Sequence, residues 1–162
     1  MSDFASLYGP VDPAAPDFEH LRRVSAGMVP FGNHTGVEIT EISAERAVVE
    51  IPEESHLRNH LGTVHAGALF TAADIAGAAA FVGAAAHGLA RVKMLVLRDS
   101  RVSFRKPAVG RVRAIGTVDP RDVAKALAGS GRFDVDGRAT IHDESGLLLA
   151  KLSFDYVCEV AA

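Results

Sequence analysis

A single carboxyl group interrupts the most apolar segment of the chain. Nearly every residue from Val64 to Ala86 is apolar, and in the helix predicted over residues 66–86 the polar side chains are Thr71 and Asp74. An ionised carboxylate among Ala, Ile and Phe is costly unless it is paired or its pKa rises. A carboxyl group with a raised pKa in an apolar cleft is suited to act as a general base. Asp74 is therefore a candidate catalytic base, although a purely structural role, accepting hydrogen bonds from a neighbouring loop, is equally open from the residues alone.

The residues just before this helix supply candidate groups for binding an oxyanion. The segment from Asn59 to Gly67, NHLGTVHAG, places an asparagine, two glycines and a histidine where the helix is predicted to begin. Helix N-termini carry unpaired N–H groups and partial positive charge, which stabilise a developing negative charge. Gly67 would let a substrate approach the backbone closely. Many glycine-containing loops only cap a helix, so this pattern alone does not establish a site.

Helix geometry separates the two groups within one chain. His65 and Asp74 are nine positions apart, which corresponds to about 900° of rotation and about 13 Å along the axis. They therefore lie on opposite sides of the helix and cannot easily reach one substrate atom. Two copies of the helix, packed side by side and antiparallel, could bring Asp74 of one chain to the His65 loop of the other. This geometry predicts a site shared within a homodimer.

The elements around the helix are predicted to be strands. Residues 36–42 and 47–51 read as two strands joined by a turn. Beyond the helix, the apolar residues alternate rather than recur with helical period, and residues 142–146 form a hairpin turn. The alternating runs are residues 101–105, 111–116 and 150–157. Because a helix that is apolar all round must be covered on most sides, we expect an α+β fold in which one curved antiparallel sheet wraps around a long central helix.

The predicted domain organisation is simple. Residues 1–29 are expected to form an N-terminal arm and a short helix over residues 18–28, and residues 30–160 to form the main domain. Prolines in the arm suggest that residues 1–16 are loosely ordered, and Pro30 is expected to stop the short helix. A further surface helix is predicted over residues 122–129.

Composition excludes several functional classes. The chain has 162 residues and a net charge of −3, so it has no basic excess to hold a nucleic-acid backbone. Cys158 is the only cysteine, which excludes an intramolecular disulfide and a cysteine-based zinc site. The N-terminus lacks a basic region followed by an apolar run, so a cytoplasmic protein is expected. Residues 64–86 are long enough to span a membrane, but they are mainly Ala and Gly with Asp74 near the middle, which favours a buried core helix.

The segment NHLGTVHAGALFTAAD resembles the signature of the hot-dog thioesterases of the phenylacetic-acid-degradation (PaaI-like) type. That signature consists of an Asn, a Gly three residues later, a His-Gly-Gly and an acidic residue nine positions after the His. The matching residues are Asn59, Gly62, His65, Gly67 and Asp74. Ala66 stands in place of the first glycine, and this His-Ala-Gly form resembles the DUF4442 branch of hot-dog proteins. The similarity covers about residues 30–158 and includes the strand and turn VSFRKPAVG at residues 102–110.

This resemblance implies a hot-dog fold and hydrolysis of an acyl thioester, such as an acyl-CoA, by a homodimer or homotetramer without a cofactor. Asp74 would be the general base or the nucleophile. The N–H of Gly67 would polarise the thioester carbonyl, while Asn59 would position water or that carbonyl. His65 would orient the loop or assist polarisation; its alternative is a histidine that only holds the loop through a backbone hydrogen bond.

Further residues are candidates for binding the substrate. Gly62, Ala66 and Thr71 border the predicted site. Several basic residues on or near the later strands would form either a solvated sheet face or a groove for the CoA phosphates. These residues are Arg101, Arg105, Lys106, Arg111 and Arg113; of these, Arg105 and Lys106 are the predicted substrate-binding pair.

The sequence is compatible with other functions. A non-catalytic hot-dog module that binds an acyl group or acts as a scaffold is the main alternative. The dehydratase and hydratase relatives carry acid and histidine motifs that this chain lacks. The histidines at positions 56, 60 and 65 have a spacing seen in metal sites, but no Glu follows His56 and the region reads as a loop, so no metal is expected.

Overall fold

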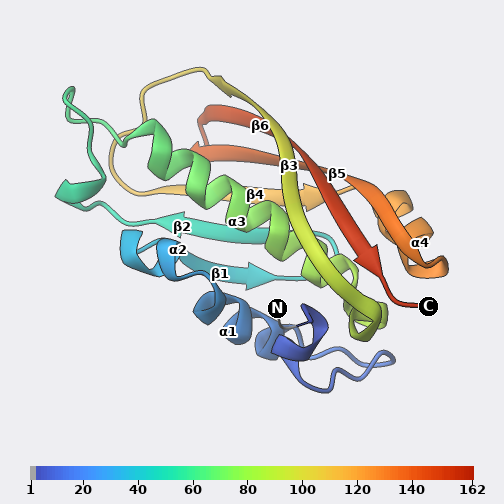
Figure 1. The fold of residues 1–162 in the computed structure, drawn as a ribbon. Coiled ribbons are helices and arrows are strands. Elements are labelled where there is room, and N and C mark those ends of the chain that lie inside the picture. The colour runs from blue at the N-terminus through green and yellow to red at the C-terminus, as the bar shows by residue number, and fades with distance from the viewer. Residues whose placement is uncertain (1–2) are drawn as a thin grey trace.

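The computed structural model describes residues 3–162, which are organised around a six-stranded antiparallel sheet (Figure 1). The strand order is β1-β2-β4-β5-β6-β3. The strands are β1 (Glu38–Ile42), β2 (Ala47–Ile51), β3 (Val92–Phe104), β4 (Val112–Val118), β5 (Gly131–Asp143) and β6 (Leu148–Val160). The expected α+β architecture, with a curved sheet around a long helix, is confirmed.

The long central helix, α3 (Ala66–Ala84), packs against the middle of the sheet, mainly on β2, β4 and β5. Small residues make this contact close. A Cβ atom added at Gly116 of β4 would overlap the backbone carbonyl of Ala76, and one added at Gly83 would overlap the carbonyl of Ser43. The helix is long and apolar enough to cross a membrane, but two thirds of it is buried inside the fold, as is usual for a core helix.

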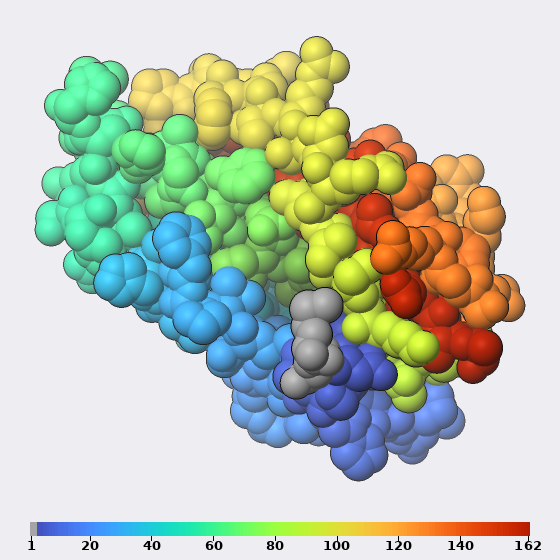
Figure 2. Space-filling view, viewed as in Figure 1, coloured from blue at the N-terminus to red at the C-terminus, as the bar shows by residue number. Residues whose placement is uncertain are grey.

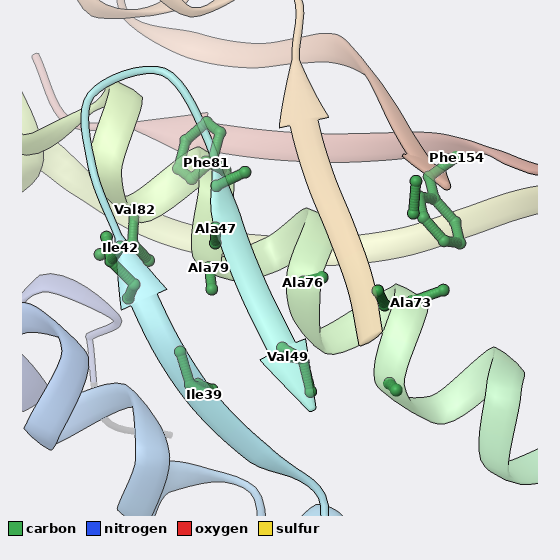
Figure 3. Close-up of a cluster of buried hydrophobic side chains, with 14 of the residues drawn as sticks. Ile39, Ile42, Ala47, Val49, Ala73, Ala76, Ala79, Phe81, Val82 and Phe154 are labelled. Atoms are coloured by element: carbon green, nitrogen blue, oxygen red, sulfur yellow. The ribbon is translucent and has the colours of Figure 1, made fainter. Parts of the chain in front are cut away.

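The core lies between α3 and the strands. Figure 3 shows side chains of β1 and β2 directed at the helix and alanines of α3 directed back at them. The labelled members of this cluster are Ile39, Ile42, Ala47, Val49, Ala73, Ala76, Ala79, Phe81, Val82 and Phe154. Alanines on the helix suit this interface because larger side chains would hold the strands away from its backbone.

The N-terminal residues are more ordered than their proline content suggests. A short 3-10 helix, η1 (Ala5–Tyr8), packs beside α1 (Phe18–Met28), and Tyr8 is only 3% exposed. The expectation of a loosely ordered arm is therefore wrong for residues 4–8. A buried aromatic ring is the reason, because its apolar surface gains more from docking than the chain loses in freedom.

The predicted helix boundaries need small corrections. The helix α1 ends at Met28 as expected, but Pro30 begins a second short helix, α2 (Pro30–Thr35), because proline suits the first turn of a helix. The helix α3 ends at Ala84, and Gly88 lies within a following 3-10 segment, η3 (Ala86–Arg91). The surface helix α4 spans Pro120–Ala128, capped by the Asp119 side chain.

The two edges of the sheet differ. At one edge, β1 is covered by α1, whose Arg22 donates a hydrogen bond from Nη1 to the Ile39 carbonyl at 3.0 Å. At the other edge, the 13-residue strand β3 pairs only with β6 among the described strands. Long unpaired edges are normally blunted or covered, so β3 offers backbone groups for pairing with another chain.

Strand order also corrects the expectation of a continuous basic face. The strands β3 and β4 follow each other in sequence, but β5 and β6 lie between them in the sheet. Arg101 on β3 is therefore distant in the sheet from Arg111 and Arg113, at the start of β4, and Arg111 forms an ion pair with Glu50 at 3.0 Å. These basic residues do not make one groove.

The close contact between β4 and α3 yields a prediction for stability. Gly116→Ala should destabilise the fold by about 2 kcal/mol or more, because the new methyl group forces the helix and strand apart. Urea unfolding would measure this change. Thr117→Ala, at the exposed neighbouring position, is the control, and equal effects of the two substitutions would contradict the packing argument.

Candidate active site

Asp74 lies near the middle of α3, half-buried, where the helix passes Tyr156 of β6. The Tyr156 hydroxyl donates to the Asp74 backbone carbonyl at 3.2 Å and lies 3.4 Å from Asp74 Oδ1. Burial raises the pKa of the Asp74 carboxyl above its ordinary value, and the hydrogen bond from Tyr156 partly offsets that rise. The environment of Asp74 therefore makes its carboxylate a better proton acceptor than a carboxylate in water.

Tyr156 is a site residue that the sequence analysis did not identify. Its side chain is only 1% exposed. Two glycines make room for it, since a Cβ atom at Gly77 would overlap its hydroxyl and one at Gly137 would press on its ring. Burial and the nearby Asp74 charge raise the pKa of Tyr156, so its hydroxyl stays protonated and acts as a donor. A signal was present, because an inward-facing tyrosine needs a polar partner and α3 offers few.

The surface of α3 is not covered on all sides. One stripe of the helix remains exposed or half-exposed between the N-terminal helices and β3, and Figure 2 shows it reaching the surface there (green, between blue and yellow). This open stripe consists of Gly67, Phe70, Thr71, Asp74, Ile75 and Ala78. The helix is therefore covered on most sides, as expected, and Asp74 lies on the side left open.

An apolar cavity of about 120 Å³ adjoins Asp74, between α3 and the N-terminal helices. Larger surface depressions, of about 270 Å³ beside α4 and about 420 Å³ beside β3, contain none of the predicted site residues, and one of about 190 Å³ beside the loop before α3 contains Gly62 but not Asp74. The chemistry of the lining therefore favours the smaller cavity, which combines apolar walls with a carboxyl group of raised pKa.

The Asn59 side chain is used within its own loop. Its Oδ1 accepts the N–H groups of Leu61 at 2.9 Å and Thr63 at 3.2 Å, and its Nδ2 donates to the Thr63 hydroxyl at 2.9 Å. Gly62 makes the turn of this loop with a positive φ of 77°. In this structure both predicted residues shape the segment that leads into α3.

His65 caps the N-terminus of α3. Its Nδ1 accepts a hydrogen bond from the Gly67 N–H at 2.8 Å, so the proton of the neutral ring is inferred to be on Nε2. The Gly67 N–H is therefore engaged, and the Thr71 hydroxyl donates to the Gly67 carbonyl at 2.8 Å. Among the described residues, the Ala66 N–H has no partner. The donors left at this helix end are the Ala66 N–H and the His65 Nε2–H.

Arg105 and Lys106 lie beside this loop. Both follow β3 directly, and their backbone N–H groups donate to the Leu149 carbonyl. Two residues further on, the Ala108 carbonyl accepts the Val64 N–H at 2.8 Å, which joins the two loops. Both basic side chains are exposed, and they belong to the loop that this hydrogen bond joins to the segment before α3.

The predicted residues thus form two groups. The loop residues, His65 and the two basic residues gather at the N-terminal end of α3, whereas Asp74 lies about 13 Å along the helix, next to Tyr156 of β6. No three His, Cys, Asp or Glu side chains in residues 3–162 lie close enough together to hold a metal ion. His56 instead lies 3.3 Å from the Thr35 carbonyl through Nε2.

Comparisons with solved structures agree on the fold. A Pseudomonas aeruginosa protein of unknown function, described as a probable thioesterase, is 22% identical, with a TM-score of 0.72 over 88% of this chain and 95% of that one. A Shewanella oneidensis protein related to the thioesterase superfamily is 21% identical, with a TM-score of 0.71 over 89% of this chain and 95% of that one. A Chlorobaculum tepidum protein of unknown function is 18% identical, with a TM-score of 0.75 over 88% of this chain and 93% of that one.

Sequence comparison identifies the family. No curated protein matches the chain. The model of a domain of unknown function, DUF4442, matches residues 19–157, which include the loop before α3, Asp74 and Tyr156. The chain therefore belongs to the DUF4442 family and has the hot-dog fold of thioesterase-superfamily structures.

Proposed function

We propose that this protein hydrolyses an acyl thioester, such as an acyl-CoA. The observation that carries the proposal is the Asp74 carboxyl group, which adjoins an apolar cavity, has a raised pKa and is held by the buried Tyr156 hydroxyl. The likeness to thioesterase-superfamily structures supports the reaction class.

The reaction adds water across the thioester. In one route Asp74 takes a proton from water as the water oxygen attacks the carbonyl carbon; the C–S bond then breaks, the thiolate is protonated, and a carboxylic acid and a thiol leave. In the other route Asp74 attacks the carbonyl and expels the thiolate, and water then opens the resulting anhydride. Both routes need the ionised carboxylate, which Tyr156 holds in place.

The oxyanion formed during attack needs donors, and the N-terminus of α3 supplies them. The unpaired Ala66 N–H and the His65 Nε2–H lie where the helix dipole favours negative charge. The Gly67 N–H becomes a third donor if the His65 ring turns away. Asn59 has one further Nδ2 hydrogen with which to position water or the carbonyl.

A second copy of the chain is required to join the two groups. Within one chain, His65 caps the N-terminus of α3, and Asp74 lies about 13 Å further along the helix axis. The unpaired edge of β3 and the open stripe of α3 leave both the sheet and the helix ready to pair with a two-fold-related copy. Such a homodimer, or a tetramer of two dimers, would place Asp74 of one protomer near the partner's His65.

The basic pair beside the loop suits a phosphorylated thiol carrier. Arg105 and Lys106 are exposed next to the proposed oxyanion donors, where they would bind the CoA phosphates. Thr71 and Gly62 border the same approach to the helix.

A non-catalytic acyl-binding module is the alternative function. The observation that favours it is that His65 occupies the Gly67 N–H. A donor already paired within the protein polarises a carbonyl less well. Release of free thiol from acyl-CoA substrates separates the two functions, since a binding module releases none.

Replacing the carboxyl group should abolish most of the activity. We expect Asp74→Asn to lower kcat by about 10²-fold or more, because the amide cannot accept a proton or attack the carbonyl. Native activity should fall as the pH drops through the raised pKa of Asp74, and the variant should lack that pH dependence. Thiol release measured across pH tests both, with the exposed Glu144→Gln as the control. Nearly full activity of Asp74→Asn would overturn the assignment.

The same substitution should stabilise the protein at neutral pH. Above its raised pKa, Asp74 is charged and its burial weakens the folded state; below its ordinary unfolded pKa it is neutral in both states. Asp74→Asn should therefore raise Tm near pH 7, and the gain should shrink as the pH falls through the raised pKa. Calorimetry at several pH values measures this gain. A lower Tm for the variant at neutral pH would identify Asp74 as a structural group instead.

Mixing two inactive variants tests the shared site. Asp74→Asn and His65→Asn, which keeps a helix-capping oxygen, should each be weakly active. Refolded together in equal amounts, they should recover about a quarter of native activity, because half of the dimers carry one intact site of two. Each variant refolded alone is the control. Absence of recovery, with mixed dimers demonstrated by mass spectrometry, would place the whole site within one chain.

A further inference from the structure

We propose that the cavity beside Asp74 is the acyl-binding pocket and that it selects a compact acyl group carrying a hydroxyl group remote from the thioester. The inference rests on the proposed thioester substrate and extends it by naming the acyl class. The residues that would set this selectivity come from the N-terminal segment of the chain, outside the loop and helix that carry the chemistry.

Residues of four elements line the cavity, which is partly open to solvent. Ile75 and Ala78 of α3 form one side of the cavity, next to Asp74, and Ile39 of β1 also lines it. Met28 of α1 and Phe4, just before η1, form the apolar wall opposite the helix. In Figure 1, α1 lies beside β1, at the edge of the sheet. An acyl group whose carbonyl carbon reaches Asp74 would extend into this space.

The N-terminal wall is anchored at several points. The Phe4 N–H donates to the Lys93 carbonyl at 2.9 Å, at the start of β3. His20 of α1 lies 2.8 Å from the Tyr8 carbonyl through Nε2, and the Phe4 and Tyr8 rings are 5.6 Å apart. A wall held by backbone hydrogen bonds and aromatic packing limits the length of the pocket.

The size of the cavity favours a compact acyl group. Its volume is about 120 Å³, and an apolar cavity of about 150 Å³ in a protein interior accepts benzene. An acyl chain of about six carbons matches that scale, whereas a long unbranched chain would meet the anchored wall.

One polar feature interrupts the apolar lining. The hydroxyl groups of Tyr8 and Ser25 are 3.0 Å apart, and these residues are 3% and 7% exposed. Their mutual hydrogen bond uses one hydroxyl hydrogen of the two. Neither hydroxyl has another hydrogen-bond partner among the described residues. The pair therefore keeps one donor hydrogen and acceptor lone pairs in an otherwise apolar pocket.

A hydroxyl group on the ligand would satisfy this pair. Buried polar groups without partners are costly, and a hydrogen bond to a ligand removes that cost. The position of the pair on the N-terminal side, across the cavity from α3, calls for a hydroxyl group at the far end of the acyl chain. An unsubstituted chain of equal length would fit the volume but leave the spare hydrogen unpaired.

Thioesters of N-acetylcysteamine test the acyl pocket without involving the CoA phosphates. The series comprises acetyl, hexanoyl, 6-hydroxyhexanoyl and dodecanoyl thioesters, with kcat/KM measured for each. We expect hexanoyl to be preferred over dodecanoyl, and 6-hydroxyhexanoyl over hexanoyl by about 3–10-fold, the size of one hydrogen bond.

Two variants locate the pocket. Ala78→Phe fills the cavity, so it should lower the ratio of hexanoyl to acetyl hydrolysis by about 10-fold or more. Ala124→Phe, at an exposed alanine of α4, is the matched control. The double variant Tyr8→Phe/Ser25→Ala removes both hydroxyl groups, a change that costs little stability because neither partner is left unpaired. It should remove or reverse the preference for 6-hydroxyhexanoyl.

The outcomes separate this inference from the proposed function. Thioester hydrolysis with a dodecanoyl preference, or with selectivity unaffected by Ala78→Phe, overturns the pocket and leaves the hydrolase. Calorimetric binding of the 6-hydroxyhexanoyl thioester that is lost in Ala78→Phe, without hydrolysis, supports the pocket and overturns the hydrolase. Neither binding nor hydrolysis of any member of the series overturns both.

Discussion

Close contact between α3 and the sheet is the constraint on which the rest of the structure depends. Where Gly116 meets the Ala76 carbonyl and Gly83 meets the Ser43 carbonyl, no room exists for even a methyl group. At these contacts the buried face of α3 carries small residues, such as Ala73 and Ala76. The polar side chains of the helix, Thr71 and Asp74, lie instead on its open stripe.

The Asp74 carboxyl group therefore has different surroundings on its two sides. The sheet side supplies the Tyr156 hydroxyl, which can reach Asp74 because Gly77 and Gly137 leave space for the tyrosine. The other side supplies the apolar cavity closed by the N-terminal segment. Burial and a single hydrogen bond have opposite effects on the pKa of Asp74, and burial has the larger one. The result is a carboxylate oriented by the fold yet open to a ligand.

The fold leaves three features incomplete within a single chain. The edge of β3 has no neighbour in the described sheet, the open stripe of α3 exposes Phe70 and Ile75, and the proposed oxyanion donors lie far from the Asp74 carboxylate. A two-fold-related copy would complete all three together, because the same rotation that pairs two edges also sets two helices antiparallel. Assembly and catalysis are thus linked in the proposed mechanism through one surface.

Local patterns in the sequence determined much of this protein. The long run of apolar residues predicted the helix α3 and made Asp74 stand out as its one carboxyl group. Alternation of apolar and polar residues predicted the later strands, and the spacing from Asn59 to Asp74 indicated the family. Only the tertiary structure decided which distant residues contact one another. Tyr156 is 82 residues from Asp74 along the chain, the cavity needs residues 4–8 folded back on α1, and β3 lies three strands away from β4 in the sheet order. Periodicity reports which face of an element is buried, but not which distant residue buries it, because that choice depends on packing throughout the folded chain.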